Sequence, residues 1–313
     1  MTYLLGVDEA GYGPNLGPLV VAVSAWGVGE QWHEPADLYD TLARVFSRTP
    51  RAGRVAIADS KALYKPRGGL RRLEHAVLAL APRVASWNGL VDTLGADPDG
   101  RQGSLPWHEG FDPLVPGDAS QAEIDSGRAR VVLGCASAGV DPPTLAARIV
   151  HPLEFNQLCD RFDSKGATLS HVSLGLLRGA VDGLAGAPVY CVLDKHGARN
   201  RYAEVIEAHF PQHTLAVDGE GRAESRYRLS GPSDITLVFR AKGESHLPTA
   251  LASMTAKLLR EVAMAALNQY WGARVPALAP TAGYPGDAGR FRADIAREWA
   301  RLGLEEDLLW RRR

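Results

Sequence analysis

Residues 3–26 read YLLGVDEAGYGPNLGPLVVAVSAW, two apolar segments separated by a turn that holds three glycines and two prolines. The β-branched and aromatic residues of both segments favour strands, and their connection is too short for a helical crossover. The chain is therefore predicted to open with an antiparallel pair of strands. Asp8 and Glu9 stand where the first strand ends, and carboxylates in such a place either face water or hold a cation.

The apolar runs that follow predict an α/β fold. Further strands are expected over residues 55–59, 189–194, 214–217 and 235–241. Helices are expected over residues 70–80, 174–184, 202–209 and 249–270. Together these elements predict one domain over residues 1–313 with a mixed five-stranded central sheet, an antiparallel meander followed by parallel strands, flanked by helices.

Two parts of the chain depart from this pattern. Residues 82–146 are rich in Gly, Pro and Asp and show little periodicity, which predicts an inserted subdomain. A structureless loop of that length is uncommon in a compact domain, so the insertion either contains a strand of its own, over residues 128–136, or folds over the sheet. Residues 271–313 are expected to form a C-terminal region of helix and loop.

The composition excludes several classes of protein. A formal net charge of −1 provides no global basic field, so any binding of nucleic acid must come from a local patch. The three cysteines lie far apart, which argues against a disulfide or zinc framework and for a cytoplasmic protein. No segment reaches the roughly 18 apolar residues of a membrane span. A monomer is favoured.

The turn GYGPNLG places Gly11, Gly13 and Gly17 after a strand, which is partly similar to the dinucleotide-binding pattern G-x-G-x-x-G. That pattern must open a helix whose N-terminus holds pyrophosphate, whereas here a β-branched run follows. The two acids beside the turn would also repel a pyrophosphate. A metal site is the preferred interpretation, a plain hairpin connection comes next, and a nucleotide cofactor comes last.

Two more acids stand where Asp8 and Glu9 do, at the ends of predicted strands: Asp194 ends VYCVLD, and Glu244 follows LVFRAKG. If these strands converge, four carboxylates could bind two divalent cations about 3.5–4 Å apart and promote displacement at phosphorus. Ligand sets made only of oxygen select Mg²⁺ or Mn²⁺. The pattern leaves rival acids open at this point, namely Asp182, Asp218 and Glu220.

Several motifs resemble those of ribonuclease HII. GVDEAGYGPNLGPLVVA resembles the signature G-(I/V)-D-E-A-G-R-G-P-x-x-G-P-(L/V)-V-x-A, and ADSKAL resembles the D-S-K-x-L that follows it. KGESHLPTALASMTAKLLRE resembles the family's acidic turn and its A-K-x-x-R helix, with Glu in place of both acids. GYP at residues 283–285 is similar to the family's K-G-Y-x-T. The motifs occur in the family's order and cover most of residues 1–81 and 147–300.

The resemblance implies a ribonuclease H-like fold and a ribonuclease H activity that cleaves the RNA strand of RNA–DNA hybrids, including ribonucleotides embedded in DNA, leaving 5′-phosphate and 3′-hydroxyl ends. It implies Mg²⁺ or Mn²⁺ as cofactor and an RNA–DNA hybrid as partner. The implied catalytic and metal-binding residues are Asp8, Glu9, Asp194 and Glu244. The implied substrate-binding residues are Gly11, Tyr12, Gly13, Ser60, Lys61, Lys257, Arg260 and Tyr284.

The chain departs from the family at Tyr12, where an arginine is usual, and at Glu244, where Asp is usual. The alternatives are therefore a ribonuclease H-like nuclease with another nucleic-acid substrate, or a catalytically impaired relative that only binds nucleic acid. The run KALYKPRGGLRRLE forms a local basic patch after a predicted strand, which indicates either phosphate contact or a solvated loop. The terminal WRRR is either a nucleic-acid contact or an idle tail.

Overall fold

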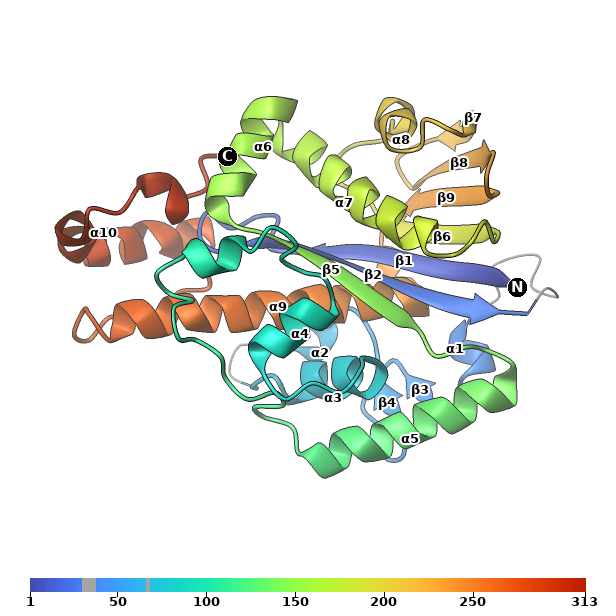
Figure 1. Cartoon of the computed structure of the whole chain (residues 1–313), viewed down its shortest axis with the longest axis horizontal. Helices are drawn as coiled ribbons and strands as arrows, with labels where there is room; N and C mark the ends of the chain where they lie inside the picture. The colour runs from blue at the N-terminus through green and yellow to red at the C-terminus, as the bar shows by residue number, and fades with distance from the viewer. Residues whose placement is uncertain (30–37, 66–67) are drawn as a thin grey trace.

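The computed structural model describes residues 1–29, 38–65 and 68–313, and a seven-stranded sheet forms its centre (Figure 1). The strands are β1 (Thr2–Ala10), β2 (Leu19–Val28), β5 (Thr144–Val150), β6 (Val189–Asp194), β7 (Thr214–Glu220), β8 (Glu224–Ser230) and β9 (Ile235–Arg240). Their order in the sheet is β5-β2-β1-β6-β9-β8-β7. β1, β6 and β9 are parallel, and β2 runs antiparallel to both β1 and β5.

The predicted α/β fold with a mixed sheet flanked by helices is confirmed, but the prediction of five strands is wrong, since the sheet has seven. The predicted strand at residues 55–59 does not join it. Val55–Ala56 (β4) pairs instead with Phe46–Ser47 (β3) in a separate two-stranded sheet. The free edge of β2 is taken by β5, which begins at the C-terminal end of the 82–146 segment. A pairing between residues so far apart leaves no local signal in the chain.

Helices cover both faces of the sheet (Figure 1). One face carries α9 (Leu247–Gly272), with α3 (Arg71–Leu80) packed on α9 and α5 (Gln121–Ala138) packed on α3. The other face carries α6 (Pro152–Phe162), α7 (Lys165–Asp182) and α8 (Ala203–His209). The shorter elements on the α9 side are α1 (Leu38–Thr41), α2 (Ser60–Leu63) and α4 (Trp87–Thr93). α10 (Pro285–Leu302) packs against the second half of α9. None of the helices described combines the length and apolar character that crossing a bilayer requires.

The strand expected over residues 128–136 is wrong, because this segment belongs to helix α5. The buried residues of α5 are Ile124, Gly127, Val131 and Cys135, a spacing of three and four that is typical of a helix face. Ser120 caps the helix by accepting a hydrogen bond from the backbone amide of Glu123. The apolar run around Val131 suggested a strand only when it was considered without these flanking residues.

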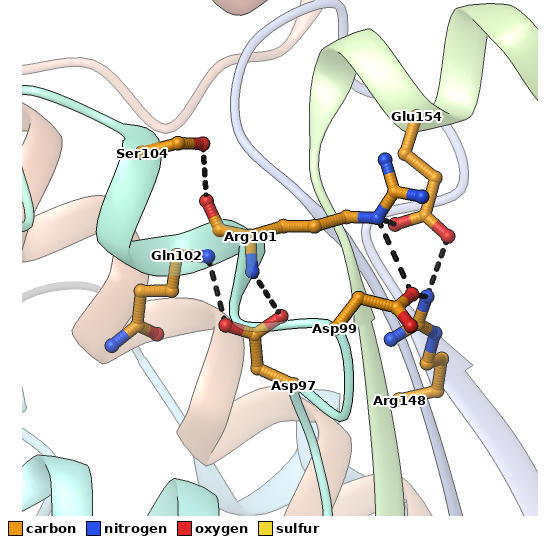
Figure 2. A network of polar contacts seen from close by, with 7 residues as sticks. All are labelled: Asp97, Asp99, Arg101, Gln102, Ser104, Arg148 and Glu154. Atoms are coloured by element: carbon orange, nitrogen blue, oxygen red, sulfur yellow. Dashed lines mark hydrogen bonds and ion pairs between the residues drawn. The ribbon is translucent and has the colours of Figure 1, made fainter.

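The 82–146 segment is attached to the sheet by the charged network shown in Figure 2. Arg148 of β5 lies 2.8 Å from Asp99 in the loop of the segment and 2.6 Å from Glu154 of α6. Arg101 lies 3.3 Å from the same Asp99, and its backbone amide donates to Asp97 at 3.0 Å. These contacts connect η1 (Arg101–Ser104) to β5 and α6, so the segment is held against the edge of the sheet.

The first turn of α9 lies directly on the sheet at Gly6 of β1. A Cβ at Gly6 would lie 2.0 Å from the backbone nitrogen of Thr249 and 2.2 Å from the carbonyl carbon of Pro248. Hydrogen bonds to both neighbours of β1 stabilise this contact: Ser24 of β2 donates to the Pro248 carbonyl at 2.8 Å, and Thr249 donates to the Val192 carbonyl of β6 at 3.0 Å. Only glycine allows the helix to come this close to the strand.

We therefore expect Gly6→Ala to lower the free energy of unfolding by about 3 kcal/mol, because the new methyl group would meet backbone atoms that cannot move without displacing α9. Urea denaturation measures this. Gly179→Ala is the matched control: Gly179 lies within α7, and a Cβ there meets nothing within 4 Å. That variant should be about 0.5–1 kcal/mol more stable than wild type. Equal stability of the two variants would contradict the close-contact interpretation.

Candidate active site at the sheet edge

Four carboxylates lie at one edge of the central sheet. Asp8 and Glu9 stand near the end of β1, Asp194 ends β6, and Glu244 lies in η2 (Gly243–Ser245) directly after β9. Because β1, β6 and β9 are parallel, their carboxyl ends share an edge, and the pairing of Val7 with Leu193 places Asp8 level with Asp194. Each of the four side chains remains partly exposed. The structure therefore brings together the four acids that the strand-end pattern suggested and the resemblance implied.

The acids are crowded enough to change one another's protonation. Burial raises the pKa of Asp8 well above its ordinary value, with repulsion from Glu9 and Asp194 adding to the effect. Burial and then Asp194 raise the pKa of Glu9 to about 7, although Lys61 opposes the shift. Burial raises the pKa of Asp194 against the hydrogen bond it accepts from the Gly243 amide at 3.1 Å. Burial, followed by Asp194, raises the pKa of Glu244.

These residues provide the donor chemistry for divalent cations, since all the ligands are carboxylate oxygens, which Mg²⁺ and Mn²⁺ prefer. Across residues 1–29, 38–65 and 68–313, no group of three or more His, Cys, Asp or Glu side chains is arranged so that it could hold a metal ion as it stands. The mutual repulsion nevertheless fits a cation, because a bound positive charge would favour the ionised form of every acid in the cluster. Asp8, Glu9, Asp194 and Glu244 therefore supply the oxygen donors that such a cation prefers.

The rival acids are engaged elsewhere. Asp182 lies 2.6 Å from Arg178, and Asp218 lies 2.8 Å from Arg228. Glu220 accepts a hydrogen bond from the Tyr227 hydroxyl. These acids therefore have polar partners outside the carboxylate cluster.

The turn after β1 is shaped by its first glycine. Gly11 has a φ of +87°, and a Cβ there would lie 2.5 Å from both the Arg260 Nε and the Pro18 carbonyl oxygen. At Gly13 a Cβ would meet only Tyr284, at 3.8 Å. Gly11 is thus required by packing, whereas Gly13 leaves the backbone accessible from outside. The turn leads into β2 with no intervening helix, so the structural context of a dinucleotide-binding loop is missing.

Two buried arginines pack against the inner side of the turn after β1 and donate hydrogen bonds to backbone carbonyls there. Arg260 is 1% exposed and donates to the Ala282 carbonyl at 3.0 Å. Arg311 is 0% exposed and donates to the carbonyls of Gly11 and Tyr12, while its guanidinium lies 3.9 Å from the centre of the Phe155 ring. Burial, followed by repulsion from Arg260, lowers the pKa of Arg311 to about 9. The C-terminal residues therefore form part of the site.

Sequence reasoning did not place Arg311 in the site, because a basic run at the end of a chain has the same local pattern whether it is buried or frayed. The informative signal would have been Trp310, an aromatic residue that follows two leucines and precedes the three terminal arginines. Its backbone forms an antiparallel bridge with Leu16 in the turn between β1 and β2. Arg311 is buried because the C-terminal segment pairs with the turn between β1 and β2.

The remaining predicted residues lie around the same edge. Ser60 is buried and accepts a hydrogen bond from Ser253 at 3.2 Å, and Ser253 in turn hydrogen-bonds to Asp8. Lys61 is exposed on α2. Partial desolvation lowers the pKa of Lys61, but the nearby carboxylates of Asp59 and Asp8 outweigh this effect, and the pKa is raised overall. The positive charge of Lys61 therefore stands beside the carboxylates.

Three predicted contacts differ in their exposure. Tyr284 is 49% exposed and begins α10 as its N-cap, with Arg260 5.9 Å from its ring centre. Lys257 is ion-paired with Glu261 and lies 4.7 Å from the centre of the Tyr64 ring. Arg260 supports the turn from the protein interior. Of the basic patch, Arg67 lies outside the described residues.

The comparisons with known proteins give structural likeness only. No protein-family profile matches the chain, and no curated protein matches it in sequence. RNase HII of Archaeoglobus fulgidus, solved with PCNA, is 14% identical at a TM-score of 0.42, with 99% of this chain and 94% of that chain covered. Ribonuclease H2 of Pyrococcus horikoshii is 14% identical at 0.45, covering 98% and 92%. Bst-RNase HIII, solved with Mn²⁺, is 14% identical at 0.43, covering 99% and 66%. What the structure itself confirms is the α/β class, a mixed sheet flanked by helices.

The raised pKa of Glu9 predicts a pH dependence of stability. Between its ordinary value of 4.5 and about 7, the folded protein keeps a proton that the unfolded chain has lost. The folded state then binds more protons, so the free energy of unfolding falls as pH rises through this window, by about 3 kcal/mol. Glu9→Gln should lack the part of this decline that Glu9 contributes and so show a shallower fall, because Asp8, Asp194 and Glu244 also have raised pKa values. Urea denaturation in EDTA from about pH 5 to about pH 8 measures both proteins.

Glu207→Gln, at an exposed position of α8, controls for the loss of a carboxylate as such. Its pH profile should run parallel to that of wild type. If the Glu9→Gln profile were parallel as well, Glu9 would not carry the shifted proton.

Arg311→Lys tests whether the guanidinium positions the turn. Lysine keeps the charge but cannot bridge two carbonyls with a rigid fork, so the backbone amides of residues 11–13 should exchange with solvent about tenfold faster. Hydrogen-exchange mass spectrometry measures this. Arg313→Lys is the control, because Arg313 lies at the surface, 3.3 Å from Asp163. Unchanged exchange in Arg311→Lys would show that the turn holds its shape without this residue.

Proposed function

We propose that this protein is a metal-dependent endonuclease that cleaves the RNA strand of RNA–DNA hybrids and leaves 5′-phosphate and 3′-hydroxyl ends. The observation that carries the proposal is the convergence of Asp8, Glu9, Asp194 and Glu244 at one sheet edge, with pKa values raised by burial and mutual repulsion. The motifs that resemble ribonuclease HII support it, since they include Asp8, Glu9 and Glu244, and Asp194 falls on the family's V-D-G, which here reads Leu193-Asp194-Lys195.

The division of labour follows from the charges. When bound, two divalent ions would supply an activated water and stabilisation of the leaving oxygen. The four carboxylates would hold those ions, and each must be ionised to do so. Lys61 stands where it can attract the phosphate towards this negative cluster, because its pKa is raised and its side chain is exposed. Without such a cation, the acids would repel the substrate.

Recognition of ribose is assigned to the turn after β1. Gly13 has no protein atom close to its Cβ position except the Tyr284 ring, so a sugar can approach the backbone. Contact with the 2′-hydroxyl is what distinguishes RNA from DNA at a given position. Tyr284, exposed beside the same glycine, is placed to stack on the adjacent sugar. Arg260 is buried behind Gly11, so it would position the turn without touching the substrate. Lys257 lies about one helical turn before Arg260 on α9.

Cleavage of a fluorescent RNA–DNA hybrid tests the proposal. Wild type should cleave with Mg²⁺ or Mn²⁺ and lose all activity in EDTA. Asp8→Asn and Asp194→Asn should abolish cleavage while leaving stability equal or higher, because each removes one of several crowded like charges. Asp182→Asn should remain fully active, since Asp182 is paired with Arg178.

Each other result has a defined meaning. Retained cleavage by Asp194→Asn would assign the chemistry to another acid. Hybrid binding without cleavage by wild type would show that the protein only binds nucleic acid. Cleavage of a structured RNA in preference to the hybrid would replace the proposed substrate. In the first two cases the mechanism stated above is wrong.

A further inference from the structure

A basic hollow lies away from the carboxylates, between α3, α5 and the loop that joins β3 to β4. It has a volume of about 360 Å³, and its charged and polar lining consists of Arg51, Arg54, Arg71, Arg72, His75 and Glu123. In Figure 1 these elements form the layer beyond α9, on the side that faces away from the sheet. α5 belongs to the 82–146 segment, so this segment completes the wall of the hollow.

The hollow contains more positive charge than its own acid balances. Arg71 is paired with Glu123 at 2.9 Å. Arg51 and Arg54 have no carboxylate partner in the described part of the chain, and Arg72 reaches only the Leu63 carbonyl, at 3.5 Å. Three guanidinium groups therefore border one cavity without a counter-charge, an arrangement that favours an anion.

The hollow is linked to the carboxylate site by two segments. The loop that carries Arg51 and Arg54 also carries Arg48, which donates to the carbonyl of Ser245 at 3.2 Å, next to Glu244. The Leu63 carbonyl that Arg72 approaches ends α2, whose second residue is Lys61. Basic side chains therefore continue from the edge of the carboxylate cluster to the hollow along connected elements.

We infer that this hollow binds a backbone phosphate of the nucleic-acid strand whose scissile bond lies at the carboxylates. Guanidinium groups suit this ligand, because their planar forks match the geometry of phosphate oxygens. The phosphate belongs to a polymer, because basic side chains on the β3–β4 loop and on α2 and α3 connect the hollow with the proposed site of cleavage. The inference rests on the proposed function for the nature of this polymer, and it adds a second contact that fixes the direction of the strand.

Salt dependence of binding tests this inference. A labelled hybrid is titrated in EDTA by fluorescence anisotropy at several salt concentrations, so that no cleavage occurs. The double variant Arg51→Gln with Arg54→Gln should lower the slope of log Kd against log salt by about one unit, the loss of one phosphate contact. A shorter hybrid that covers the carboxylates but ends before the hollow should bind wild type and the double variant alike.

The matched control is Arg178→Gln with Arg228→Gln. Both arginines are paired with carboxylates, and Arg228 lies opposite Thr236 at the start of β9, at the end of the sheet remote from Glu244. This control should leave the slope unchanged. Circular dichroism melting establishes that each variant is folded, which is expected because none of the substituted side chains is fully buried.

Equal slopes for wild type and the Arg51/Arg54 variant on the long hybrid would overturn the inference. The inference would also be overturned if the double variant changed how well inorganic phosphate competes with the hybrid but left the slope of log Kd against log salt unchanged. The hollow would then bind a small free anion and not a phosphate of the strand. The proposed function fails separately, through absence of cleavage with Mg²⁺ or Mn²⁺. A protein that binds the hybrid with the predicted slope difference but does not cleave it would support the hollow and contradict the nuclease.

Discussion

The packing of α9 against β1 and its following turn is the constraint on which the rest of the structure depends. Three glycines lie along this contact: a Cβ at Gly6 would meet the backbone of the helix, whereas a Cβ at Gly11 or Gly17 would meet a side chain of the helix. The pairs are Gly6 with Thr249, Gly11 with Arg260 and Gly17 with Met264. The helix positions are separated by 11 and 4 residues, which return close to the same face at 3.6 residues per turn. One face of one helix thus determines the path of residues 6–17.

This packing also sets the position of the catalytic candidates. Asp8 lies between the first two contacts and is hydrogen-bonded to Ser253 on the same helix, so its side chain is fixed relative to α9. β6 and β9 are then placed by their parallel pairing with β1, and their ends carry Asp194 and lead to Glu244. The crowding of four negative charges is a consequence of the fold, and the stability lost to their repulsion is recovered from the apolar packing on both faces.

Positive charge is distributed around this cluster at two depths. Arg311 and Arg260 are buried and donate to backbone carbonyls, so they define the shape of the turn while remaining unavailable to solvent. Lys61 and the arginines of the basic hollow lie at or near the surface, where their positive charges can bind an anion. A net charge close to zero is therefore compatible with a nucleic-acid substrate, because the two signs are separated in space.

The sequence by itself determined the features whose signal is local. The strand over residues 189–194 was placed at its observed bounds, and α9 was placed within two residues at each end. Positions after strands gave the four acids as candidates, and only the resemblance to ribonuclease HII separated them from the rival acids. What only the tertiary structure decided depends on residues distant in the chain. β5 occupies the edge of β2, the sheet grows to seven strands, and Arg311 is buried beneath a turn some 300 residues away. Periodicity reports which face of a segment is apolar, but it carries no information about which partner will cover that face.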